Sequence, residues 1–121
     1  MTPRSASPAT EDDILTGIIE AMLLTGWRVM HIRRSDRALV MGSQGFPDII
    51  ATPPHGGPVL VIETKSANGR VTDDQAAWLV AFAQAGVTAA VIRPDGYDRA
   101  VNLVIVGSSA HDAWAWSWRA A

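Results

Sequence analysis

The sequence predicts an α/β domain in which a mixed central sheet is flanked by helices. Its 121 residues, 48% hydrophobic and 18% charged, suit one ordinary globular domain with a buried core. Segments of helical periodicity alternate with short apolar runs, in the order helix, three or four strands, helix, strand, strand, helix. A strand–helix–strand unit between residues 59 and 92 implies parallel pairing through a right-handed crossover.

The first helix is expected directly after a short N-terminal segment. Residues 1–9 read as a disordered lead-in, and residues 10–121 as the domain. Thr10 is a suitable N-cap for a helix over residues 11–25, which Gly26 ends. One apolar stripe recurs at helical spacing and should face the sheet: Ile14, Leu15, Ile18, Ile19, Met22 and Leu23.

Three or four short strands are expected after this helix. Residues 27–33 alternate loosely enough to form a strand. Residues 35–45 are polar and contain glycine, which predicts a loop or hairpin with room for a short strand at 38–41. Residues 48–52 form a further strand, and the Pro- and Gly-rich residues 53–57 form a turn.

The strand–helix–strand unit comes next. Residues 59–65 begin with an apolar run that has no polar face, as in a buried central strand. Thr72 and Gln75 have the spacing of a capping box, which predicts a helix through Ala85. The apolar, β-branched residues 87–92 then form another strand.

The C-terminal part is predicted to add one strand and one helix. A turn at residues 94–96 precedes the predicted strand at 100–106, and residues 111–119 form the terminal helix. In that helix Trp114 and Trp118 share a face and should pack on the core or on a partner subunit. Stacking on unpaired bases is the alternative use of these rings.

The chain contains a single lysine, Lys65, and its position is informative. Residues two apart in a strand point to the same face, so Glu63 and Lys65 should project together, with Thr64 turned away. Asp48 can enter the same site from a neighbouring strand. Two carboxylates and the backbone carbonyl of Thr64 are hard oxygen ligands that suit Mg²⁺ or Mn²⁺. Lys65 would orient a metal-bound water or neutralise a phosphate.

Each of these residues also has an ordinary structural explanation. An Asp after Pro is often a turn residue, and a Glu-x-Lys pair on a strand is often a solvated pair of charges. Glu63 and Lys65, however, end an otherwise apolar strand. Ionisable groups are costly in such a place unless they have a function, so the set favours a nuclease-like site.

The net charge of −2 does not by itself indicate nucleic-acid binding. Arginines nevertheless gather in one segment, at positions 28, 33, 34 and 37. Such a cluster can grip phosphates or can simply be a solvated strand edge. The candidate DNA contacts are Arg33, Arg34, Arg37 and Arg70. Three scattered histidines lack the spacing of metal ligands and are expected at the surface: His31, His55 and His111.

Pro47-Asp48 followed by Glu63-Thr64-Lys65 resembles the PD-(D/E)xK nuclease superfamily, and the wider pattern resembles its VRR-NUC branch. The wider pattern covers residues 11–92 and adds Gly45, the loop 68–70, Gln75 and the step Gly86-Val87. The resemblance implies a restriction-endonuclease-like fold. It also implies metal-dependent hydrolysis of phosphodiester bonds in DNA, often at branched or flapped structures in replication and repair.

The resemblance further implies a glutamine after the lysine and an acidic residue on the first helix. Gln75 matches the glutamine and would help to position the site, although its spacing also makes it the capping partner of Thr72; both roles can hold. At about 100° per residue, Glu11 lies near the middle of the apolar stripe and Glu20 almost opposite. Glu11 is therefore the favoured catalytic and metal-ligating acid, although first-turn acids are also common for dipole reasons.

These observations predict a metal-dependent, structure-selective DNA nuclease. A chain this short has little room for a separate DNA-recognition domain, so a homodimer would enlarge the binding surface. The alternatives are a dimer like a Holliday-junction resolvase and a non-catalytic nucleic-acid-binding module with the same fold. No apolar run reaches the length of about 20 residues that spans a membrane. The absence of a secretory segment and of cysteine suits the cytoplasm.

Overall fold

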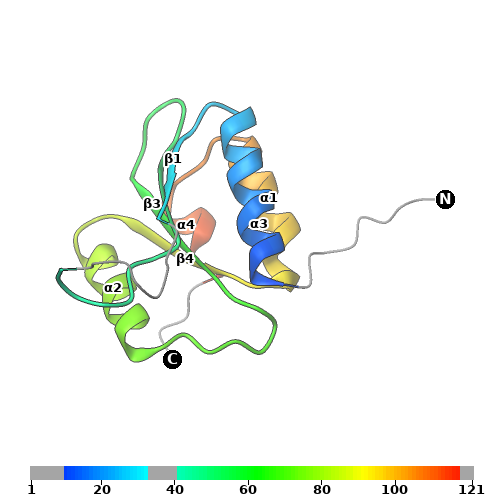
Figure 1. Ribbon diagram of the computed structural model, residues 1–121. Helices are drawn as coiled ribbons and strands as arrows, with labels where there is room; N and C mark the ends of the chain where they lie inside the picture. Colours follow the sequence, from blue (N-terminus) through cyan, green and yellow to red (C-terminus); the bar gives the residue numbers. More distant parts are fainter. Residues whose placement is uncertain (1–9, 33–40, 118–121) are drawn as a thin grey trace.

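A four-stranded sheet organises the chain in the computed structural model, which describes residues 10–32 and 41–117 (Figure 1). The strands stand in the order in which they occur along the chain: β1 (Arg28–His31), β2 (Ile49–Thr52), β3 (Leu60–Thr64) and β4 (Thr88–Ile92). The helices are α1 (Glu11–Leu24), α2 (Asp73–Gln84), α3 (Tyr97–Ile105) and the single turn α4 (His111–Trp114), with a 3₁₀ turn, η1, at Pro94–Gly96.

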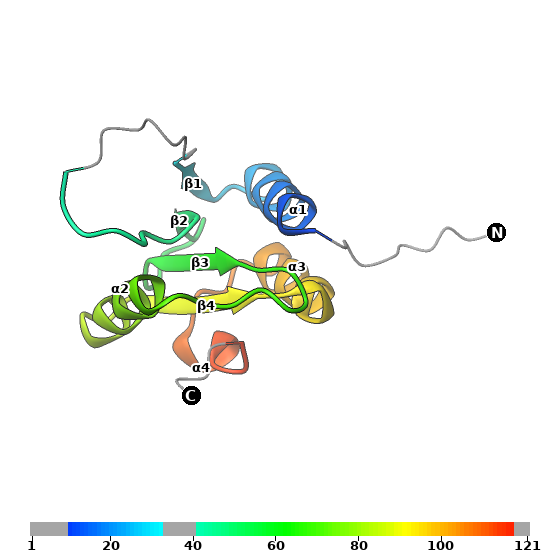
Figure 2. The ribbon, with the colours of Figure 1, turned by 60° about the horizontal axis from the view of Figure 1, so that its bottom comes forward.

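The sheet is mixed, as predicted. β1, β2 and β3 pair antiparallel, whereas β3 and β4 pair parallel because α2 carries the chain across between them. Helices α1 and α3 lie together on one face of the sheet, and α2 lies on the other (Figure 2). The structure therefore confirms a single small α/β domain with helices on both faces of the sheet.

Strand β3 is buried on both sides because each face of the sheet has its own apolar cluster. Leu60 and Ile62 belong to the larger cluster, which α1 and α3 cover, while Val61 belongs to the smaller one with Leu79 of α2. All five residues of β3 are buried. This pattern confirms the predicted central strand, and it means that any polar group at the end of β3 meets a largely dry environment.

Helices α1 and α2 begin where the capping signals predict. The side chain of Thr10 accepts a hydrogen bond from the amide of Asp13, and Ile14, Ile18 and Met22 are fully buried along one stripe. At α2 both bonds of the predicted capping box with Thr72 are present.

The predicted strand at residues 100–106 is wrong, because this segment forms helix α3. Its β-branched residues favour a strand locally, but propensity is weak and tertiary packing overrides it. In the helix Ala100 and Val104 fall on one buried face against α1, while Ile105 and Val106 remain exposed. The carbonyl of Val104 also accepts a hydrogen bond from the Trp27 indole.

The predicted terminal helix is shorter than expected and ends at Trp114. Trp114 is fully buried in the core, as predicted. The turn that follows covers the outer edge of β4, where the amide of Val91 donates to the hydroxyl of Ser117 at 3.2 Å. This contact satisfies one edge group that a hydrogen-bond ladder would otherwise leave open.

Some sequence predictions fall outside the described residues. These are the lead-in at 1–9, most of the short strand at 38–41, Trp118, and the candidate DNA contacts Arg33, Arg34 and Arg37. In the described part of the chain, no helix is long and apolar enough to cross a membrane.

Candidate active site

The centre of the site is an ion pair at the C-terminal end of β3. The Lys65 ammonium lies 3.4 Å from Glu63 Oε2, and the two side chains are 9% and 2% exposed. Both project toward the face that α2 covers, so the alternation predicted from the sequence is confirmed. Burial of such a pair carries a desolvation penalty that can exceed the Coulombic gain, which favours a functional reason for its presence.

Gln75 connects this pair to the first turn of α2. Its Nε2 donates to Glu63 Oε2 at 2.9 Å, and its Oε1 accepts from the Thr72 amide at 3.0 Å. A carboxamide has donors on one atom and acceptors on the other, so it can serve both groups together. Gln75 therefore caps α2 and contacts Glu63 at the same time, so the capping of α2 also orients the donor to Glu63. A part for Gln75 in catalysis stays a prediction.

Asp48 lies beside the same strand end, at the residue before β2. Its Oδ2 accepts from both the amide and the hydroxyl of Thr64, each at 2.9 Å. Ile49 pairs with Ile62, so one further step of the antiparallel register places Asp48 opposite Glu63. The structure thus brings Asp48, Glu63 and Lys65 to one end of the sheet, and Thr64 points away from the ion pair, as predicted.

His31 supports Asp48 in a way that the sequence pattern missed. Its Nδ1 lies 2.8 Å from the backbone carbonyl of Asp48, and because a carbonyl oxygen only accepts, Nδ1 is the donor. His31 is half-buried on β1, where it pairs with Ile49. Only the register of β1 against β2 brings it there, and nothing in the local sequence indicates that register.

Gly45 explains how the segment before Asp48 reaches α2. Its φ is +93°, and a β-carbon at this position would lie only 2.6 to 2.8 Å from backbone atoms of Asp74 and Gln75. No side chain fits in that space, and the positive φ also favours glycine. The loop that carries Asp48 therefore packs directly on the first turn of the helix that carries Gln75.

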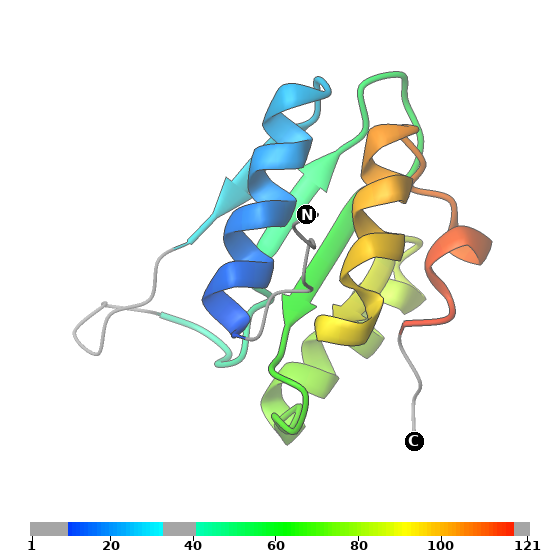
Figure 3. The same ribbon diagram turned by 90° about the vertical axis from the view of Figure 1, so that its right-hand side faces the viewer.

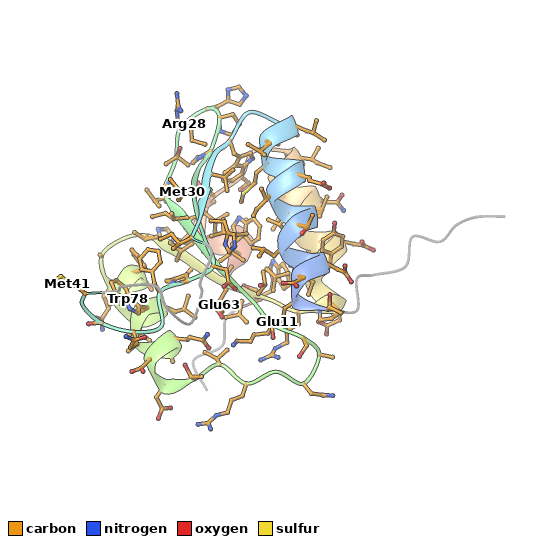
Figure 4. The ribbon with its side chains drawn as sticks, viewed as in Figure 1. Glu11, Arg28, Met30, Met41, Glu63 and Trp78 are labelled. Carbon is orange, nitrogen blue, oxygen red and sulfur yellow. The ribbon has the colours of Figure 1, made fainter. Side chains whose placement is uncertain are left out.

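Glu11 is exposed in the first turn of α1. Figure 3 shows that this end of α1 lies at the same end of the sheet as the C-terminus of β3, and Figure 4 labels Glu11 and Glu63 in that region. Within residues 10–32 and 41–117, however, no three acidic or histidine side chains are gathered closely enough to hold a metal ion. The role of Glu11 as a ligand stays a prediction.

Glu20 is exposed on α1, as helical phase predicts, and its charge acts on Tyr97 of α3. The pKa of Tyr97 is raised above its ordinary value, first by burial and then by the negative charges of Asp98 and Glu20. Glu20 is therefore electrostatically coupled to α3.

Arg70 is the one candidate DNA contact that the structure describes. Its guanidinium is largely exposed and lies 3.7 Å from the carboxylate of Asp73. An exposed ion pair of this kind contributes little to stability, so Arg70 can exchange its partner for a phosphate at little cost.

Comparisons with known proteins agree with this fold. The family model of the VRR-NUC domain matches residues 19–95. Two solved structures of VRR-NUC domain proteins are similar. One is 18% identical with a TM-score of 0.59, covering 80% of this chain and 96% of that chain. The other is 22% identical with a TM-score of 0.54, covering 80% and 83%.

A third solved structure, the Holliday junction resolvase Hjc of Archaeoglobus fulgidus, is 25% identical with a TM-score of 0.44 and covers 69% of this chain and 64% of that chain. Among curated proteins no match was found. The family match spans more than half of the sequence and includes Asp48, Glu63, Lys65 and Gln75. The chain therefore belongs to the VRR-NUC family of nucleases, with the restriction-endonuclease-like fold of the PD-(D/E)xK superfamily.

Proposed function

We propose that this protein is a divalent-metal-dependent deoxyribonuclease that cleaves branched, flapped or junction DNA in replication or repair. The observation that carries the proposal is the buried Glu63 carboxylate held between Lys65 and Gln75, at 3.4 and 2.9 Å. Its position beside Asp48, in a member of a nuclease family, supports catalysis more than a structural role.

The donor set fits a hard divalent cation such as Mg²⁺ or Mn²⁺. Asp48 and Glu63 supply carboxylate oxygens, and the backbone carbonyl of Thr64 adds a third oxygen of the kind these ions prefer. Mg²⁺ usually keeps several of its waters, so few protein ligands are enough. Glu11 is the candidate for a further carboxylate. When bound, the ion would acidify a water and offset the negative charge that grows on the phosphate.

The side chains around this donor set have separate tasks. Lys65 offers a compact positive charge beside Glu63, suited to neutralising a phosphate oxygen or orienting the attacking water. Gln75 keeps the Glu63 carboxylate in place, since its amide is itself fixed by Thr72. The amide and hydroxyl of Thr64 hold Asp48. Such preorganisation lowers the cost of assembling the reactive geometry.

DNA is the proposed partner, and the arginines are its proposed phosphate contacts. Arg70 is exposed in the loop after Lys65, while Arg33, Arg34 and Arg37 follow β1 in the sequence. A homodimer would double the surface available to a branched substrate. Loss of a phosphate-binding arginine should weaken binding to all sequences alike and flatten the salt dependence.

The test is a cleavage assay on plasmid, flap and four-way-junction DNA with Mg²⁺, Mn²⁺ or Co²⁺. We expect cleavage to fall about a hundredfold or more in Lys65→Ala and Asp48→Ala, with unchanged circular dichroism. Asp112→Ala, which removes an exposed acid from α4, is the matched control and should cleave normally.

Three outcomes separate the candidate functions. Preferential cleavage of the four-way junction by a dimer would favour an enzyme like a Holliday-junction resolvase over a flap or end nuclease. DNA binding without cleavage under any metal would favour a non-catalytic module. Equal digestion by the wild type and Lys65→Ala would show that the activity does not come from this site.

A further inference from the structure

The loop that follows Lys65 is held by hydrogen bonds from an arginine that lies beyond the end of β4. Arg93 comes directly after β4, and its Nη1 donates to the backbone carbonyls of Ser66 and Gly69, at 3.0 and 2.6 Å. The two carbonyls are three residues apart. One guanidinium nitrogen therefore closes the first turn of the loop from outside, in addition to the local bond from the Gly69 amide to Ser66.

This loop packs against the stem of Lys65. A β-carbon on Gly69 would stand 3.5 Å from Lys65 Cδ and 2.9 Å from the hydroxyl of Ser66. The Gly69 backbone therefore lies next to the methylene chain, with room for little more than a β-carbon between them, and the Lys65 side chain is only 9% exposed. If the loop moved away, the Lys65 methylene chain would lose a neighbouring backbone segment, and the ammonium could then move away from Glu63.

The backbone of Lys65 is fixed from the same side. Its amide donates to the carbonyl of Ile92 at 3.0 Å, so the residue that accepts this bond immediately precedes Arg93. The end of β4 thus restrains Lys65 through two contacts. Ile92 accepts the hydrogen bond from the Lys65 amide, and Arg93 binds the loop that lies next to the Lys65 side chain.

We propose that Arg93 is the positioning residue for Lys65. Its guanidinium holds the loop from Ser66 to Gly69 against the lysine stem and keeps the ammonium near Glu63. The effect on cleavage rests on the proposed nuclease function, but the effect on the lysine itself does not. Two other roles are the outcomes to exclude: a direct contact between Arg93 and DNA phosphate, and a contribution to folding alone.

The single lysine makes the first test direct. Protein labelled with ¹³C at the lysine ε-carbon gives one side-chain NMR signal, which belongs to Lys65. In Arg93→Met we expect that signal to move toward its position in the unfolded chain and to sharpen, because the side chain becomes more mobile. The control is Arg99→Met, whose guanidinium lies over the Trp116 ring at 4.5 Å and should leave the signal unchanged. No DNA or metal is needed.

Kinetics supply the second test. Arg93→Met should lower kcat about tenfold with little change in KM, because a misplaced catalytic group slows the reaction without weakening substrate binding. Both bonds come from one nitrogen, and a lysine ammonium has three donors, so Arg93→Lys should recover most of the rate. Arg93→Gln, a smaller neutral change, replaces the methionine variant if circular dichroism shows that the latter is unfolded.

The outcomes are distinct. An unchanged lysine signal in a folded Arg93→Met protein overturns the proposal, whatever happens to cleavage. An increase in KM with a weaker salt dependence, at constant kcat, assigns Arg93 to phosphate binding instead. If the wild type cleaves nothing, the nuclease function fails, and the NMR comparison still decides whether Arg93 positions Lys65.

Discussion

Replacing Gln75 with methionine should separate the support of Glu63 from the capping of α2. Methionine has a similar length but cannot donate to Glu63 or accept from Thr72. Thr72→Ala is the matched comparison, because it removes the hydroxyl that accepts a hydrogen bond from the backbone amide of Gln75 at 3.2 Å. It leaves the Gln75 side chain in place. Both changes weaken the capping box, but only the first removes the donor to Glu63.

The expected magnitudes differ because the two bonds differ. Loss of an N-cap side chain costs about 1 kcal/mol. A hydrogen bond to a charged group contributes about 1.5 to 3 kcal/mol, and the Glu63 carboxylate is 2% exposed, so water cannot readily replace the lost donor. We therefore expect Thr72→Ala to lower the free energy of unfolding by about 1 kcal/mol and Gln75→Met by about 2 to 4 kcal/mol.

Urea unfolding followed by tryptophan fluorescence would measure both values, with unchanged m-values as the check that each variant remains two-state. Cleavage would be assayed well below the unfolding midpoint of each variant. It should fall in Gln75→Met, because Glu63 loses its alignment, and should stay near the wild-type rate in Thr72→Ala. Equal losses of stability in the two variants, with equal cleavage, would show that the bond from Gln75 to Glu63 contributes neither to stability nor to cleavage.

Three further predictions follow from other parts of the structure. In urea unfolding, Gly45→Ala should lower the free energy of unfolding by about 2 kcal/mol or more. Gly86→Ala, at a similar positive φ but in open space, should lower it by only about 1 kcal/mol. Equal losses would contradict the close approach of Gly45 to α2. Because the pKa of Tyr97 is raised above 10.0, its contribution to the free energy of unfolding is fully present below pH 10.0 and is lost as the pH rises above that value. In an ultraviolet titration of this single tyrosine, Glu20→Gln should lower the midpoint, because it removes one of the negative charges that raise the pKa. An unmoved midpoint would exclude the coupling between Glu20 and Tyr97. Trp114→Ala should lower the free energy of unfolding by about 3 to 5 kcal/mol, because the ring is fully buried. A thermal unfolding midpoint close to that of the wild type would contradict the place of Trp114 in the core.

The parts of the site that could be predicted from the sequence depend on neighbours within a few residues. Glu63 and Lys65 share a face because strand geometry alternates every residue, and their 3.4 Å separation confirms it. Thr72 and Gln75 form the capping box because three residues span one helical turn. Both inferences use only local backbone geometry, and no tertiary contact could reverse them once the strand and the helix exist.

Other features depend on contacts between distant segments, which the sequence does not reveal. His31 reaches the carbonyl of Asp48 only through the register of β1 against β2, and Arg93 reaches the loop after Lys65 only through the parallel pairing of β3 with β4. The same limitation explains the wrong prediction for α3. There the packing of Ala100 and Val104 against α1 outweighed a run of β-branched residues.

The two edges of β3 show how local and distant contacts combine at the site. The antiparallel ladder with β2 pairs Ile49 with Ile62, and beyond it the amide of Thr64 donates to the carboxylate of Asp48 in place of a strand carbonyl. On the opposite edge the parallel ladder continues, since the amide of Lys65 donates to Ile92. A shift of either ladder by one residue would turn Glu63 and Lys65 to the other face or remove the donor from Asp48. The geometry of the candidate active site is therefore set by strand register on both sides of β3.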